Sequence, residues 1–152
     1  MTPDNRNILV AGQVNSDGNV PLENLTTEPQ AQHLGCFAGG MMALASKIFS
    51  NEDDLADARK LVEGCIWGYE ALPLGIMPEI MHLVPCRDRN YCPWDEKVWE
   101  DAIASSYEDK KSAEERIETE RLVPGVTKID DRRYILRYGA LTLCSTRPLA
   151  YL

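Results

Sequence analysis

The sequence predicts a mainly α-helical fold with a short β-hairpin near its amino-terminus. Apolar residues recur at helical spacing in residues 33–49 and again in residues 53–71. A third helix is expected from about residue 94, where the apolar spacing is again helical. With 152 residues, of which 44% are hydrophobic, the chain is long enough for one ordinary domain with a core.

The expected hairpin lies within the first residues of the chain. The segment from Asn7 to Gly12 has the apolar character of a short strand. The polar run from Asn15 to Asn19 is typical of a turn that leads into a second strand. A two-stranded hairpin is therefore the simplest prediction for this region.

The helix expected over residues 33–49 is apolar around most of its circumference, so we expect it to be buried on most sides. Gly39 and Gly40 lie inside it, although each glycine costs about 1 kcal/mol relative to alanine in a helix. Close packing against another backbone is the favoured explanation, and close approach of a ligand is the alternative.

The next helix has clear end signals. Asn51 is a suitable N-cap, acidic residues follow in the first turn, and Pro73 prevents the helix from continuing. Because few residues separate the two helices, they should form an antiparallel hairpin. The charge-dense residues 108–121 predict a solvated helix or an exposed connection.

Charge and hydropathy argue against two kinds of partner. The net charge of −8 makes a nucleic-acid partner improbable. No run of 18 apolar residues occurs and the amino-terminus has no signal-peptide pattern, so the sequence contains no membrane segment and no targeting signal. Five cysteines nevertheless predict a secretory protein whose amino-terminal targeting region is missing from this chain.

Four of the cysteines can be paired. Cys36 and Cys65 lie on consecutive antiparallel helices, so a disulfide between them is geometrically reasonable and closes a loop of roughly 30 residues. Cys86 and Cys92 flank a polar loop short enough for a local bridge. Cys144 is left over, which is unusual in a secreted chain.

A zinc site is the competing interpretation of the second pair. His82, Cys86 and Cys92, with or without His33, would be the ligands. Their spacing matches no common structural zinc pattern, such as paired Cys-x-x-Cys motifs. The disulfide is therefore the preferred prediction.

Two other side chains are candidates for function. Glu79 follows Gly75 and Pro78, which restrict the loop, and a carboxylate accepts strong hydrogen bonds from sugar hydroxyls. In the simpler alternative, Glu79 is a first-turn acid of a helix that begins after Pro78. Asn24-Leu25-Thr26 is an acceptor sequence for N-glycosylation.

Four motifs occur in an order shared with a known family. They are His33-Leu34-x-Cys36-Phe37-x-Gly39-Gly40, Ala58-Arg59-x-Leu61-Val62-x-x-Cys65, Gly75-Ile76-x-Pro78-Glu79 and the run from Lys128 to Arg137. Together they resemble the class I α-1,2-mannosidases of glycoside hydrolase family 47, most closely those of filamentous fungi.

The resemblance implies a calcium-dependent, inverting hydrolase that trims α-1,2-linked mannose from high-mannose N-glycans in the secretory pathway or outside the cell. It implies an (α/α)7 barrel considerably longer than this chain, which would be an internal slice of it. It also supports the Cys36–Cys65 disulfide and places Glu79 and Arg137 among the sugar-binding residues.

The resemblance ends after Arg137. The family continues there with Pro-Glu, whose glutamate is the candidate catalytic base, whereas this chain continues with Tyr138-Gly139-Ala140. Residues 138–152 contain no Asp or Glu. We therefore divide the chain into a catalytic-domain fragment, residues 1–137, and a divergent tail, residues 138–152, which a frameshift, a retained intron or a mispredicted exon would explain.

An inverting glycosidase needs one carboxylic acid and one carboxylate base on opposite sides of the scissile bond. By the resemblance, the general acid precedes this chain, the base falls after Arg137, and the calcium ligand is a threonine further on. We therefore assign no catalytic residue and no metal ligand, and expect the isolated chain to be inactive. The alternatives are a non-catalytic mannose-binding remnant and a cysteine-rich metal or redox module unrelated to sugar.

Overall fold

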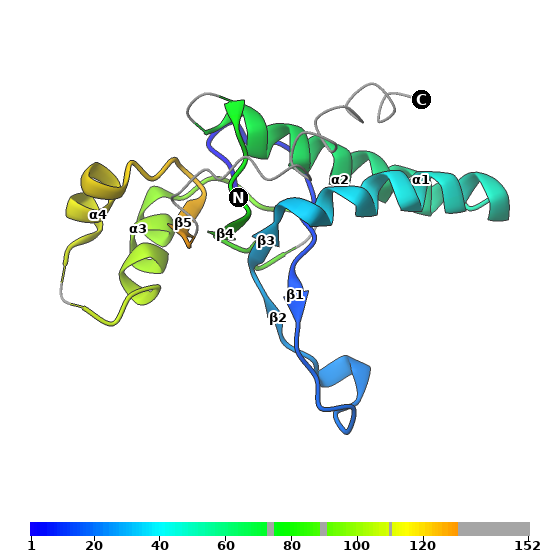
Figure 1. Ribbon diagram of the computed structural model, residues 1–152, viewed down its shortest axis with the longest axis horizontal. Helices are drawn as coiled ribbons and strands as arrows, with labels where there is room; N and C mark the ends of the chain where they lie inside the picture. Colours follow the sequence, from blue (N-terminus) through cyan, green and yellow to red (C-terminus); the bar gives the residue numbers. More distant parts are fainter. Residues whose placement is uncertain (73–74, 89–90, 110, 131–152) are drawn as a thin grey trace. The chain divides into compact units, whose positions relative to one another are not determined.

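The computed structural model describes residues 1–72, 75–88, 91–109 and 111–130 (Figure 1). These residues form four α-helices and five short strands, which confirms the mainly helical fold with small sheets. The chain divides into two units that are each discontinuous in sequence. Unit 1 comprises Met1–Arg6, Gly12–Ala31 and Met81–Ile129, and unit 2 comprises Asn7–Ala11, Gln32–Ile80 and the segment from Asp130.

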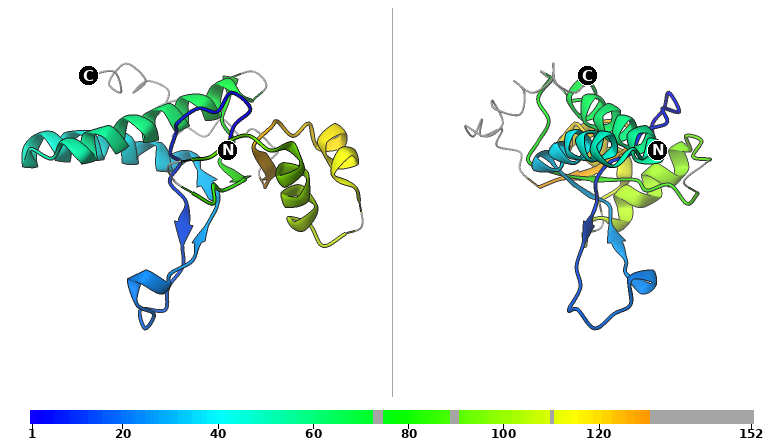
Figure 2. Two further views of the ribbon diagram at one scale, coloured as in Figure 1. Left: turned by 180° about the vertical axis from the view of Figure 1, so that it is seen from behind. Right: turned by 90° about the vertical axis from the view of Figure 1, so that its right-hand side faces the viewer.

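Unit 2 is built on a helical hairpin. A single 3₁₀ turn, η2 (His33–Cys36), leads into α1 (Phe37–Phe49), and α2 (Glu52–Glu70) runs back beside it (Figure 1, Figure 2). Ser50 adopts the left-handed conformation that ends α1. Asn51 caps α2, because its side-chain oxygen accepts hydrogen bonds from the backbone N–H groups of Asp53 and Asp54. Both expected helices and the expected cap are confirmed.

The prediction that the first helix is buried on most sides is wrong. Gly39 and Ser46 are the buried residues of α1. By contrast, Met41, Leu44 and Ile48 expose 66%, 69% and 74% of their surface. Apolar periodicity predicts a helix, but it does not say how many neighbours the helix has, and in unit 2 the α2 contact covers one face.

Gly39 explains why the two helices can approach closely. A Cβ built on Gly39 would lie 2.8 Å from a methyl carbon of Val62 and 3.3 Å from the carbonyl oxygen of Ala58. Close backbone packing, the favoured explanation for this glycine, is therefore confirmed. A Cβ built on Gly40 would meet nothing within 4 Å, so the same requirement does not hold there.

The segment from Asn7 to Ala11 is not the strand that its composition predicted. It lies along α2 instead, where the N–H of Leu9 donates to the carbonyl of Lys60 at 3.0 Å. A Cβ on Gly64 would fall 1.9 Å from the carbonyl oxygen of Leu9, so only glycine fits at this crossing. An apolar run of this length can cover a helix as well as pair with a strand, which is why the prediction failed.

A hairpin does form in unit 1, a few residues later than expected. Strand β1 (Gln13–Val14) pairs antiparallel with β2 (Thr27–Glu28), and the connection carries a 3₁₀ turn, η1 (Leu22–Asn24). The chain continues into a three-stranded sheet of order β3 (Gln30–Gln32), β4 (Ile80–Leu83) and β5 (Val126–Ile129). In its antiparallel β4–β5 pair, Met81 faces Ile129 and His82 faces Lys128.

The core of unit 1 lies between this sheet and α3 (Glu96–Ser105). Met81, Ile103 and Val126 are fully buried, and the indole N–H of Trp99 donates to the carbonyl of Val126 at 2.9 Å. Asp95 caps α3 by accepting from two backbone N–H groups, so the third expected helix is confirmed.

The charge-dense segment forms a helix, α4 (Ala113–Glu120), but it is not fully solvated. Arg116 exposes 8% of its surface, lies 3.7 Å over the ring of Tyr107, and pairs with Asp109 and Glu120. A cation shared between two carboxylates and an aromatic face can be buried where an isolated charge cannot.

Among the described residues, no helix combines the length and the apolar character that crossing a membrane requires.

Candidate functional site

The loop that carries Glu79 is constrained at both ends. Gly75 adopts φ +64°, which glycine tolerates without strain, and its N–H donates to the carbonyl of Leu72 at 3.1 Å. Met77 and Pro78 are buried, whereas Glu79 is exposed. The loop therefore buries its apolar residues and presents the carboxylate to solvent.

The backbone of Glu79 is held by a neighbouring segment. Its carbonyl accepts a hydrogen bond from the N–H of His33 at 2.9 Å, at the start of η2. The next residue, Ile80, begins strand β4 and accepts from the N–H of Asp130 at 3.3 Å. Because a strand follows Pro78, the alternative in which Glu79 is the first-turn acid of a helix is wrong.

His33, whose N–H bonds this loop, is itself buried, with 6% of its surface exposed. Its Nε2 forms a hydrogen bond with the hydroxyl of Tyr69, and the two rings meet edge to face with centroids 5.6 Å apart. Burial lowers the pKa of His33, and the Glu79 carboxylate opposes part of that shift. Burial thus favours the neutral form of the imidazole, while the negative charge of Glu79 favours the protonated form.

A disulfide fastens the same region. Cys36 at the end of η2 is bonded to Cys65 on α2, with an S–S distance of 2.09 Å and a Cα–Cα distance of 5.7 Å. The sulfur of Met77 lies 3.9 Å from the sulfur of Cys36, so the loop packs against this bridge. Helix hairpin, disulfide and loop thus form one framework around His33 and Glu79.

Sequence reasoning did not single out the His33–Tyr69 pair as part of a site. The signal was present in the cysteine pairing. His33 precedes Cys36 by three residues and Tyr69 follows Cys65 by four, so a bridge between the two cysteines brings the imidazole and the phenol together. Arg137, the other expected sugar-binding residue, and Cys144 lie outside the described residues.

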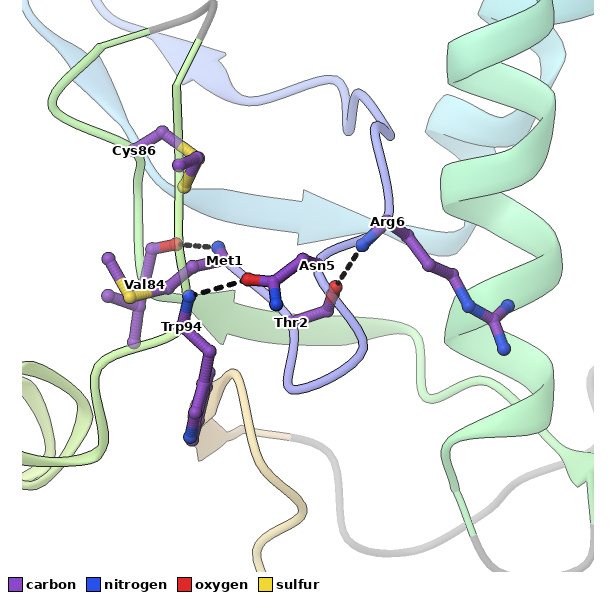
Figure 3. The surroundings of a disulfide bond; sticks show 8 residues. Met1, Thr2, Asn5, Arg6, Val84, Cys86 and Trp94 are labelled. Atoms are coloured by element: carbon purple, nitrogen blue, oxygen red, sulfur yellow. Dashed lines mark hydrogen bonds between the residues drawn. A yellow bond between two sulfur atoms is a disulfide. The ribbon is translucent and has the colours of Figure 1, made fainter.

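The second disulfide lies in unit 1. Cys86 and Cys92 are joined with an S–S distance of 2.02 Å. Figure 3 shows Cys86 near the amino-terminal residues, where the Met1 amino group donates to the carbonyl of Val84 at 2.9 Å. In the same view the side-chain oxygen of Asn5 accepts from the N–H of Trp94 at 2.7 Å. These two hydrogen bonds tie the chain start to both sides of the bridged loop.

The zinc interpretation does not agree with this arrangement. Cys86 and Cys92 are bonded to each other, so neither sulfur is available as a thiolate ligand. The Nε2 atom of His33 is engaged in a hydrogen bond with the hydroxyl of Tyr69.

Calcium, which the resemblance implies, also lacks a site in the described part of the chain. No group of three or more His, Cys, Asp or Glu side chains there is arranged to hold a metal ion. Calcium prefers six to eight oxygen ligands. The described residues offer no such set of ligands, and we assign no reaction step that depends on calcium.

A constrained loop that presents a carboxylate is suited to hydrogen bonding with polyhydroxylated ligands. Comparison with known protein families gives the class of the protein as glycoside hydrolase. The match covers residues 1–139 and is to glycosyl hydrolase family 47. The chain belongs to this family, the class I α-mannosidase type, as its motifs indicated. No curated protein and no solved structure matches the chain.

Family membership establishes glycosidase ancestry and an oligosaccharide as the substrate class. The match includes the amino-terminal residues 1–32, in addition to the motif-bearing segment from His33 onward. It ends at Gly139, two residues after Arg137.

Proposed function

We propose that this protein serves the α-1,2-mannosidase function of its family, the removal of mannose from high-mannose N-glycans, and that Glu79 binds the sugar. The family match over residues 1–139 is the observation that carries this proposal. The exposed carboxylate of Glu79, on a loop held by His33 and packed on the Cys36–Cys65 bridge, supports the assignment.

The chemistry of Glu79 suits sugar recognition. An ionised carboxylate offers two acceptor oxygens to neighbouring hydroxyl donors, and such charge-assisted hydrogen bonds are stronger than neutral ones. Because the backbone of Glu79 is already ordered by the His33 hydrogen bond, less conformational entropy is lost when a ligand binds. Burial lowers the pKa of His33, which favours the form of the imidazole without a competing positive charge.

We also propose that the α1–α2 hairpin is one element of the family's (α/α)7 barrel. The exposed apolar residues of α1 support this, because a neighbouring hairpin would cover them. They are spaced three and four residues apart, on the stripe that helix packing uses: Phe37, Met41, Leu44 and Ile48, with the exposed Leu34 of η2 preceding them at the same spacing.

Catalysis is not expected from the 152-residue chain alone. A general acid needs a raised pKa so that it carries its proton at working pH. Hydrogen bonding from Arg116 lowers the pKa of Asp109, and hydrogen bonding from Ser112 lowers that of Glu114. These two carboxyls are favoured as ions, so neither has the raised pKa that a general acid needs.

The isolated chain is therefore expected to be an inactive fragment of a mannosidase. Incubating it with a high-mannose N-glycan and calcium, and measuring released mannose, should give no release above buffer. Measurable turnover would refute this part of the proposal. Calorimetric glycan binding without turnover would favour the alternative, a non-catalytic mannose-binding remnant. A cysteine-ligated metal site would require free thiolates, whereas the two disulfides engage four of the five cysteines.

The role of Glu79 is tested by isothermal titration calorimetry with the same glycan. Glu79→Gln keeps the side-chain shape but loses the charge, so affinity should fall roughly 10- to 100-fold, the value of one or two hydrogen bonds to a charged group. Glu63→Gln is the matched control, because Glu63 is an exposed glutamate of unit 2 on α2. Equal affinities for the two variants would remove Glu79 from the binding site.

We place the protein in the secretory pathway, in the endoplasmic reticulum, the Golgi or outside the cell. Two disulfides in a chain of this size are typical of an oxidising compartment.

A further inference from the structure

We propose that Asn24 carries an N-linked glycan at the end of the β1–β2 hairpin. Asn24-Leu25-Thr26 is the only Asn-x-Ser/Thr sequence in the 152 residues, and its middle residue is not proline. The residue that follows, Thr27, is not proline either. This modification site lies in unit 1 and does not depend on the role proposed for Glu79.

The acceptor is accessible. Asn24 and Thr26 are both exposed, as are residues 15–21 in the same connection. Figure 1 shows this connection, with η1, at the end of the β1–β2 ribbon. A bulky, hydrated glycan can therefore be attached without displacing a packed side chain or desolvating a polar group.

The local conformation also suits an acceptor. The N–H of Asn24 donates to the carbonyl of Pro21 at 2.9 Å, which closes a single 3₁₀ turn, and Thr26 immediately precedes β2. The asparagine thus stands at the end of a turn and the threonine at the start of an extended segment. Exposed loop tips are the places where enzymes reach a folded chain most readily.

The hairpin can adapt to the glycosylating enzyme at low cost. Only two residue pairs, Gln13 with Glu28 and Val14 with Thr27, define the β1–β2 ladder. A two-stranded ribbon is marginally stable on its own in water. Local opening of the ribbon therefore costs little free energy compared with unfolding the unit.

The glycan would have a physical role at this position. Val14 and Val20 expose 47% and 43% of their surface on the same hairpin, and a two-stranded ribbon presents an outer edge on each strand. Exposed strand edges with apolar side chains promote pairing between molecules. A hydrated glycan at Asn24 would hinder that pairing and keep the chain soluble.

The test is expression of the chain behind a cleaved secretion leader in a eukaryotic host, so that the mature polypeptide has these 152 residues. Wild type should run as a larger species that an asparagine-glycan amidase reduces by the mass of one glycan. The amidase converts the linked asparagine to aspartate, so peptide mass spectrometry should find that change at Asn24.

Variants of the acceptor sequence identify the site. Asn24→Gln and Thr26→Ala should abolish the shift, whereas Thr26→Ser should retain it, because serine also supplies the hydroxyl. Asn19→Gln is the matched control, since Asn19 is exposed in the same connection but outside an acceptor sequence. Analysis of both secreted and cell-retained protein covers any variant that folds poorly. Unmodified wild type in both pools, or a shift that survives Asn24→Gln, would overturn the proposal.

Discussion

At the scale of single residues, the environment of His33 differs strongly from that of a solvent-exposed histidine. It is buried, hydrogen-bonded to Tyr69, and within the electrostatic influence of the Glu79 carboxylate. Burial lowers its pKa, because a charged imidazolium loses hydration that the neutral ring does not need. The folded chain therefore binds this proton less tightly than the unfolded chain does.

This difference predicts a loss of stability in mild acid. The contribution of His33 is fully present above the unfolded pKa of about 6.5 and declines as pH falls below that value, where the unfolded chain gains the proton first. The midpoint of urea unfolding should thus be lower at about pH 5.5 than at about pH 7.5. His33→Gln should reduce the difference and His82→Gln, at the other histidine of the chain, should keep it. A His33→Gln variant with an unchanged pH dependence would contradict the prediction.

At the scale of elements, the α1–α2 hairpin depends on a close contact at one glycine and not at its neighbour. Gly39 faces Val62 and Ala58 on α2, whereas Gly40 is exposed. Two adjacent glycines in one helix therefore have different physical reasons to be present. At Gly39 a side chain would push the helices apart, while at Gly40 glycine only adds conformational freedom to the unfolded chain.

Alanine substitutions at these two positions should change stability in opposite directions. Gly39→Ala should lower the free energy of unfolding by about 1–3 kcal/mol, the usual cost of overpacking. Gly40→Ala should raise it by about 0.5–1 kcal/mol, because alanine is the better helix former. Urea unfolding monitored by circular dichroism measures both. Changes of the same sign would show that the helix contact does not discriminate between the two positions.

At the scale of the whole molecule, each unit contains one disulfide. Cys36–Cys65 lies in unit 2 with a sequence separation of 29, and Cys86–Cys92 lies in unit 1 with a separation of 6. A longer closed loop removes more entropy from the unfolded chain. The Cys36–Cys65 bridge also holds the framework around His33 and Glu79. The same bond therefore stabilises the fold and positions the candidate site.

Removing the two bridges should therefore have unequal effects. By the loop-entropy relation, replacing Cys36 and Cys65 with alanine should cost about 3–4 kcal/mol, and replacing Cys86 and Cys92 about 2–3 kcal/mol. Urea unfolding without reductant, with the two double variants measured beside wild type, gives the comparison. A larger loss for the shorter loop would indicate that native packing around that bridge, and not loop entropy, dominates.

Local signals in the sequence determined much of this protein. Helical apolar spacing, the cap at Asn51 and the start of a third helix near residue 94 were all readable, because they depend on residues close together in the chain. The motifs from His33 onward also determined the family, which the match over residues 1–139 confirms.

Tertiary structure alone decided the features that depend on residues far apart. It placed the segment from Asn7 to Ala11 on α2 and not in a sheet, left one face of α1 exposed, and started a strand after Pro78 where a helix was possible. It also joined His33 to Tyr69 beside Glu79. Periodicity records that a residue is apolar, whereas burial depends on which partner occupies the facing surface, and that information is distributed over the whole fold.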